Sequence, residues 1–152
     1  MRRLLTFTLI GLASLTVCRM ALAHCQVPCG VYGDQRRFET MLEDTTTIAK
    51  AIEQITELAD RSDALSKNQL TRWVNTKEDH ASNIQKVIAD YFMTQRLKPG
   101  AEGLVKKLTG AHSVMVAAMK CKQTVDPEAA KALQQSIYAF YEAYEGRKPD
   151  FE

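Results

Sequence analysis

The chain has 152 residues, of which 45% are hydrophobic and 25% are charged, and this is enough for one ordinary globular domain. Its formal charge of +2 arises in the first 23 residues, which hold three of the 20 Lys and Arg residues and no acid. The rest has 17 basic and 18 acidic residues, a formal charge of −1, which excludes the basic surface of a nucleic-acid-binding protein.

The first 23 residues have the pattern of a secretory signal peptide. A basic head, Met1-Arg2-Arg3, precedes an apolar run of about 14 residues over 4–17, which is short for a membrane span. Ala21-Leu22-Ala23 then matches the A-x-A site of signal peptidases. We therefore expect a processing peptidase to cut between Ala23 and His24, which places the mature protein in the periplasm or outside the cell. The alternative is an N-terminal anchor helix, which Arg19 disfavours.

Residues 24–152 are predicted to form one all-α domain that begins with two helices behind a short N-terminal hook. The first helix is expected from about Phe38 to Asp60, because apolar residues recur there at steps of three and four. Ser66-Lys67-Asn68-Gln69 is typical of a capping box at the start of the second helix. The first stripe is Met41, Leu42, Thr45, Ile48, Ala49, Ile52, Ile55 and Ala59. The second is Leu70, Trp73, Val74, Ala81, Ile84, Val87, Ile88, Tyr91 and Phe92, with Lys77 as a polar break.

Two more helices follow a turn at Lys98-Pro99-Gly100. Asp126-Pro127-Glu128 predicts the start of the fourth helix, with an Asp cap and Pro in the first turn. Short connections between four helices predict an antiparallel four-helix bundle, with a frayed tail after Gly146. The third stripe is Leu104, Val105, Leu108, Met115, Val116 and Met119. The fourth is Ala129, Leu133, Ile137, Phe140, Tyr141 and Tyr144.

The segment ALAHCQVPCGVYG, residues 21–33, gathers nitrogen and sulfur donors around the expected cleavage site. Cleavage would give His24 a free α-amine besides its imidazole. Cys25 would offer its amide nitrogen and a thiolate, and Cys29 a second thiolate. Such a tetragonal N/S set favours Ni(II) or Cu(II) over zinc, and it excludes calcium and magnesium, which take oxygen ligands.

The pattern His24-Cys25-x-x-Pro28-Cys29-Gly30-x-Tyr32 resembles the nickel-binding hook of the nickel superoxide dismutase family, and Asp90-Tyr91-Phe92 resembles a stretch of its bundle. The resemblance implies a homohexamer of four-helix bundles with one nickel ion per chain. It also implies that nickel cycles between the +2 and +3 states while superoxide becomes oxygen and hydrogen peroxide.

The resemblance assigns roles to individual residues. It makes His24, Cys25 and Cys29 the nickel ligands and places Tyr32 in the substrate pocket, with Tyr91 as its partner. Glu39 matches a glutamate that orients the histidine ring, and His80 falls where the family has an arginine.

The chain also departs from the family pattern at three places. Gly33-Asp34 replaces Asp-Pro after the hook tyrosine, and Met93 replaces a lysine, which leaves Lys122 as a weak candidate for guiding the superoxide anion. The third departure is His80 in place of the family arginine. Because Glu78 and Asp79 precede it on the expected helix, His80 also has a second interpretation, as a solvated surface histidine.

Two other functional hypotheses stay open at this stage. One is an exported nickel- or copper-binding helical protein without catalytic turnover. The other is a helical bundle in which Cys25 and Cys29 form a local disulfide, although three cysteines after the leader are not a disulfide framework. Cys121 is expected to be a buried thiol or a helix-end residue, and His112 a core or interface residue.

Overall fold

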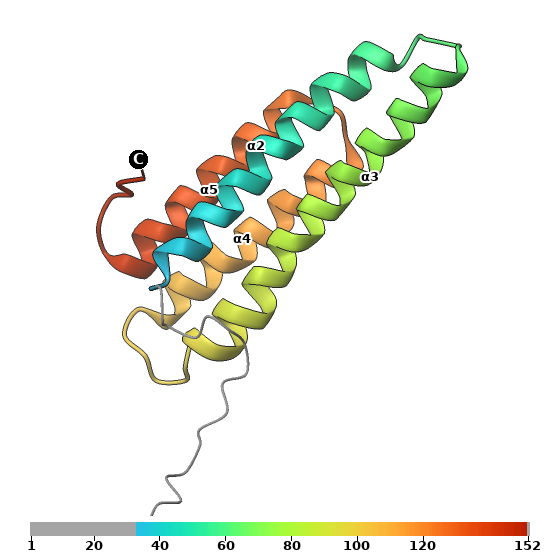
Figure 1. The fold of residues 1–152 in the computed structure, drawn as a ribbon. Coiled ribbons are helices and arrows are strands. Elements are labelled where there is room, and N and C mark those ends of the chain that lie inside the picture. Colours follow the sequence, from blue (N-terminus) through green and yellow to red (C-terminus); the bar gives the residue numbers. More distant parts are fainter. Residues whose placement is uncertain (1–32, 152) are drawn as a thin grey trace, which may run out of the picture.

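The computed structural model describes residues 33–151, so the predicted signal peptide and hook lie outside the described residues. The described chain forms α2 (Gln35–Leu58), α3 (Ala64–Lys86), the π-helical segment η1 (Val87–Arg96), α4 (Leu104–Gln123) and α5 (Pro127–Glu145). Figure 1 shows an antiparallel bundle in which η1 continues α3. α2 and α4 each pack against both α3 and α5. The predicted all-α four-helix bundle is confirmed.

None of the helices in residues 33–151 combines the length and the apolar character that crossing a bilayer requires.

Aspartate side chains cap the N-termini of α3 and α5. Asp63 accepts a hydrogen bond from the backbone nitrogen of Ser66 at 2.9 Å, so α3 begins at Ala64 and the predicted capping box at Ser66 is wrong. Asp126 accepts from the backbone nitrogen of Glu128 at 3.0 Å, which confirms the predicted start of α5. In each case the carboxylate satisfies an N–H group that has no partner within the helix.

The predicted apolar stripe of α4 is partly wrong, because Leu104, Leu108 and Met115 pack against the core but the other three residues are exposed. Val105 is 79% exposed, and Val116 and Met119 are each 42% exposed. The buried face instead carries small side chains, namely Ala111, Val114, Ala118 and Cys121. Small residues are needed there because α5 approaches closely. A Cβ atom on Gly110 would lie 3.3 Å from the Cα atom of Phe140.

The stripes of the other helices are mostly confirmed. The α5 stripe is buried as predicted, apart from the half-buried Tyr144. Ala49 of α2, Ala59 directly after α2 and Val74 of α3 are exposed. Each of these residues lies at the border of its helix's apolar face. At that border, a spacing of three or four residues does not show whether a side chain is buried or exposed.

Lys77, the polar break in the α3 stripe, is buried and only 3% exposed. Its ammonium group donates to the carbonyl oxygens of Cys121 at 2.8 Å and Lys122 at 2.7 Å, and it pairs with Glu78 at 3.2 Å. Lys77 therefore caps the C-terminus of α4, where a positive charge meets carbonyls without helical partners. Cys121 is buried at this helix end as predicted, and burial raises the pKa of its thiol to about 11.

Aromatic side chains fill the core at the opposite end of the bundle. The ring of Phe38 lies 4.8 Å from that of Phe92, 5.3 Å from Phe140 and 5.0 Å from Tyr141, measured between centroids. These tilted and edge-on contacts join α2, η1 and α5. After Gly146 the chain leaves the helix as predicted, but the tail turns back on the bundle, where Phe151 packs on the ring of Tyr141 at 4.8 Å.

Candidate functional site

Asp34 marks the point at which the N-terminal segment enters the bundle, directly before α2. It is 9% exposed, and its carboxylate accepts hydrogen bonds from three side chains of other elements. Tyr91 donates to Oδ1 through its hydroxyl group. Arg96 donates to Oδ2 from Nε at 2.9 Å and Nη2 at 2.6 Å, and Tyr144 donates to the same oxygen at 2.5 Å. We call these four residues the Asp34 anchor.

The π-helical geometry of η1 brings two members of the anchor together. Tyr91 and Arg96 are five residues apart, which in an α-helix would turn their side chains about 140° away from each other. In η1 the hydrogen bonds span five residues, as in the bond from the Leu97 nitrogen to the Phe92 oxygen at 2.9 Å. The wider turn places Tyr91 and Arg96 on one face, and π-helical turns often occur at functional sites.

The environment of Asp34 keeps its carboxyl group ionised. Burial by itself raises the pKa, but hydrogen bonds from Tyr144, Tyr91 and Arg96 together outweigh burial and hold the pKa below its usual value. The pKa of Tyr144 is raised, first by burial and then by its bond to Asp34. At neutral pH the anchor therefore includes the carboxylate of Asp34, the guanidinium ion of Arg96 and a protonated Tyr144.

Glu39 lies beside a pocket of about 520 Å³ near the point where the N-terminal segment enters. Among the described residues, Gly33, Gln35, Arg36 and Glu39 line this pocket. Glu39 accepts a hydrogen bond from Gln35 at 3.1 Å and pairs with Arg36 at 3.4 Å, and its side chain is 35% exposed. Its carboxylate is therefore accessible from the side on which the hook residues join the bundle.

His80 lies in a separate polar cluster between α2 and α3. Its Nδ1 atom is 2.6 Å from Oδ1 of the buried Asp44, whose Oδ2 accepts from Asn83 at 2.6 Å. Asp44 follows Glu39 by five residues on α2, which places the two about 7.5 Å apart along the helix and on different sides of it. The predicted supporting residues Glu39, His80 and Tyr91 thus have three different sets of partners, and their roles around the metal stay predictions.

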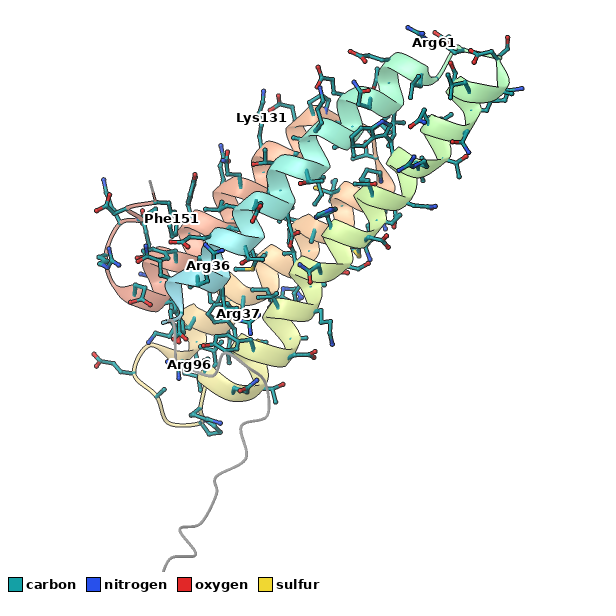
Figure 2. The ribbon with its side chains drawn as sticks, viewed as in Figure 1. Arg36, Arg37, Arg61, Arg96, Lys131 and Phe151 are labelled. Carbon is teal, nitrogen blue, oxygen red and sulfur yellow. The ribbon has the colours of Figure 1, made fainter. Side chains whose placement is uncertain are left out.

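Arginines gather at the end of the bundle that carries the Asp34 anchor. Figure 2 shows Arg36, Arg37 and Arg96 there, and the guanidinium group of Arg37 lies 4.7 Å from the ring centroid of Tyr91. Lys122 lies at the C-terminus of α4, near the other end of a helix about 30 Å long. Lys122 therefore lies far from the end of the bundle at which the N-terminal segment joins α2.

Sequence reasoning missed most of the anchor. Asp34 stood out only as a departure from a pattern, while Arg96 and Tyr144 were not singled out as site residues. The partners of Asp34 are 57, 62 and 110 residues away, so no local spacing could reveal them. Asp44 gave a weak signal, as an acidic residue beside Thr45 on the apolar face of α2.

Residues 33–151 contain no group of three or more His, Cys, Asp or Glu side chains that could hold a metal ion. The predicted ligands His24, Cys25 and Cys29, and the pocket residue Tyr32, all precede Gly33 and lie outside the described part of the chain.

A family model described as nickel-containing superoxide dismutase matches residues 19–148. No curated protein and no solved structure shows a significant match to the chain. The family match covers the whole helical bundle and extends through the residues that precede it. The chain belongs to the nickel-containing superoxide dismutase family.

Proposed function

We propose that this nickel-dependent superoxide dismutase holds its nickel at an N-terminus that is created by cleavage between Ala23 and His24. The family match over residues 19–148 carries the proposal, because it identifies the metal and the reaction. The donor set supports it as well. His24, Cys25 and Cys29 supply the nitrogen and sulfur atoms that tetragonal nickel prefers.

Bound nickel would supply an acceptor and a donor of single electrons for two superoxide anions, which take up two protons and become oxygen and hydrogen peroxide. The chain must first provide deprotonated ligands: a neutral α-amine and imidazole from His24, an amide nitrogen from Cys25, and two thiolates. Cleavage is essential to this arrangement, because the nitrogen of His24 is an amide in the precursor and an amine only afterwards. Signal removal would therefore also complete the metal site.

The described residues suggest how the bundle supports this segment. A ligating imidazole usually donates its other N–H group to a carboxylate, and Glu39 presents one in the pocket beside Gly33. The hydroxyl proton of Tyr91 is directed to Asp34, so we assign Tyr91 a positioning role behind Tyr32. We propose His80 as a further supporting residue, acting through its other ring nitrogen while Asp44 holds Nδ1.

We further propose that residues 1–23 direct export to the periplasm or the cell exterior, and that the mature chains assemble into a homohexamer. The A-x-A site supports export. The exposed apolar side chains of Val105, Val116 and Met119 on α4 support association. Light scattering of the purified protein should give six chain masses, and a monomeric mass would contradict the assembly.

The proposed function is tested by mass analysis of the protein recovered after export, combined with elemental analysis and a superoxide assay. We expect a chain that starts at His24, one nickel per chain, and rapid superoxide consumption. Nickel or copper binding without superoxide consumption would instead indicate a metal-binding protein without turnover. A Cys25–Cys29 disulfide with no stoichiometric metal would contradict the proposal altogether.

A further inference from the structure

We propose that Asp34, Arg96 and Tyr144 position the nickel-binding segment, by fixing the point at which that segment leaves the bundle. The inference rests on the proposed function, since it concerns the same metal site. It assigns a positioning role to residues outside the proposed ligand set of His24, Cys25 and Cys29.

A comparison of three helix starts shows that Asp34 has an unusual role. Asp63 and Asp126 precede α3 and α5, and each accepts a hydrogen bond from a backbone nitrogen of its own helix. Asp34 occupies the same position before α2 but makes no side-chain capping bond. Its carboxylate instead binds η1 and α5 through Arg96 and Tyr144. Helix initiation therefore does not explain why this carboxylate is buried.

The anchor rests on a rigid base. The ring of Tyr144 lies 5.2 Å from that of Phe92 and 5.8 Å from that of Phe38, and the ring of Tyr91 lies 5.3 Å from that of Phe92. Closely packed rings of this kind hold side chains in single rotamers. The two tyrosines that donate to Asp34 are therefore themselves fixed, as the support of a metal site must be.

Asp34 is also close enough along the chain to control the ligands. It follows Cys29 by five residues, and five residues span at most about 18 Å when fully extended. It follows Tyr32, the predicted pocket residue, by two. Fixing Asp34 on η1 and α5 therefore limits where the thiolate of Cys29 can lie relative to Glu39 and Tyr91.

The experiment compares chains that begin at His24 and carry Tyr144→Phe or Asp34→Asn. Tyr144→Phe removes one hydroxyl group and keeps the ring, so it is the variant that is safer for folding. Lys77→Met is the matched control, because it removes a buried polar contact at the far end of α4 (Figure 1). Each chain is titrated with Ni²⁺ against a chelator of known affinity. The nickel spectrum is recorded, and the thermal unfolding of the metal-free chain is measured.

We expect both anchor variants to bind Ni²⁺ about 10-fold or more weakly and to show an altered nickel spectrum at temperatures where the metal-free chain is folded. Lys77→Met should lower the unfolding temperature but keep the parent affinity and spectrum. Parent-like nickel affinity and spectrum in both anchor variants would overturn the positioning role and leave the proposed function intact. A parent chain that binds no nickel would overturn both.

Discussion

Two buried charged residues, Asp34 and Lys77, each fix a helix end by hydrogen bonds between distant elements. Asp34 accepts from η1 and α5 at the start of α2, and Lys77 donates from α3 to the last turn of α4. Both are 9% exposed or less, and a buried charge is stable only when such partners compensate for lost hydration. Substituting either residue should therefore have a measurable effect on stability.

Asp34→Asn should lower the free energy of unfolding at neutral pH by about 1–3 kcal/mol, because hydrogen bonds to a charged group are lost. The pKa of Asp34 is lower in the folded protein than its ordinary 3.8. Its contribution is therefore complete above about pH 4 and is lost as the pH falls through the folded pKa. Urea unfolding at pH 6 and pH 3 should show a smaller acid-induced loss in the variant. An equal loss in both proteins would contradict this account.

Lys77→Met should lower the free energy of unfolding by about 1–3 kcal/mol, since the carbonyls of Cys121 and Lys122 lose their donor. Lys131→Met is the control, because Lys131 is exposed and forms only a surface pair with Glu128. Chemical denaturation measures both variants. If the two substitutions had the same small effect, Lys77 would not be a cap.

The sequence marks Lys77 as polar within an apolar stripe, but it does not show what the charge meets. The carbonyls that it caps belong to residues 44 and 45 positions later. The same limit hides the anchor, whose contacts span up to 110 residues. Buried polar residues can be recognised from helical spacing, whereas their partners depend on how the helices pack.

At the scale of elements, α4 and η1 depart most from the sequence-based expectation. Hydrophobic spacing predicted that the large apolar residues of α4 face the core, but only some of them pack against it, and the fully buried face holds small residues. η1 was expected to be the α-helical end of the second helix. Its wider turns lie where Tyr91 and Arg96 bind Asp34, and these are tertiary contacts that local propensity does not encode.

Gly110→Ala tests the close approach of α4 and α5. Alanine normally stabilises a helix relative to glycine by about 1 kcal/mol. Here the new Cβ atom would lie 3.1 Å from the ring and 3.3 Å from the Cα atom of Phe140, which is fully buried among other rings. We expect a net destabilisation of about 1–3 kcal/mol in thermal or urea unfolding. Ser113→Ala, at an exposed position of α4, should have little effect, and a stabilised Gly110→Ala would contradict the predicted contact.

For the whole molecule, periodicity and turn chemistry were sufficient to predict a bundle of four antiparallel helices. The short motif His24-Cys25-x-x-Pro28-Cys29 indicated the family, which the match over residues 19–148 confirms. Both predictions depend on local patterns of a few residues. The hook and the signal peptide lie outside the described residues, so the way in which the bundle supports the metal stays a proposal.

Nickel binding by the mature protein should weaken in acid, because the ion must displace protons from the α-amine, the amide of Cys25 and two thiols. The ordinary pKa values are about 8 for an α-amine and about 8.5 for a thiol. Nickel content after equilibration against a chelator should fall between pH 7 and about pH 4. Full retention at about pH 4 would contradict the ligand set.

The central claim is that cleavage before His24 creates the catalytic nickel site. It is tested most directly by comparing two refolded, nickel-treated chains, one beginning at His24 and the other retaining Ala23 in front of it. Superoxide decay followed by stopped-flow absorbance should be fast with the first chain and close to the uncatalysed rate with the second, because the nitrogen of His24 is then an amide. Equal activity of the two chains would contradict the claim.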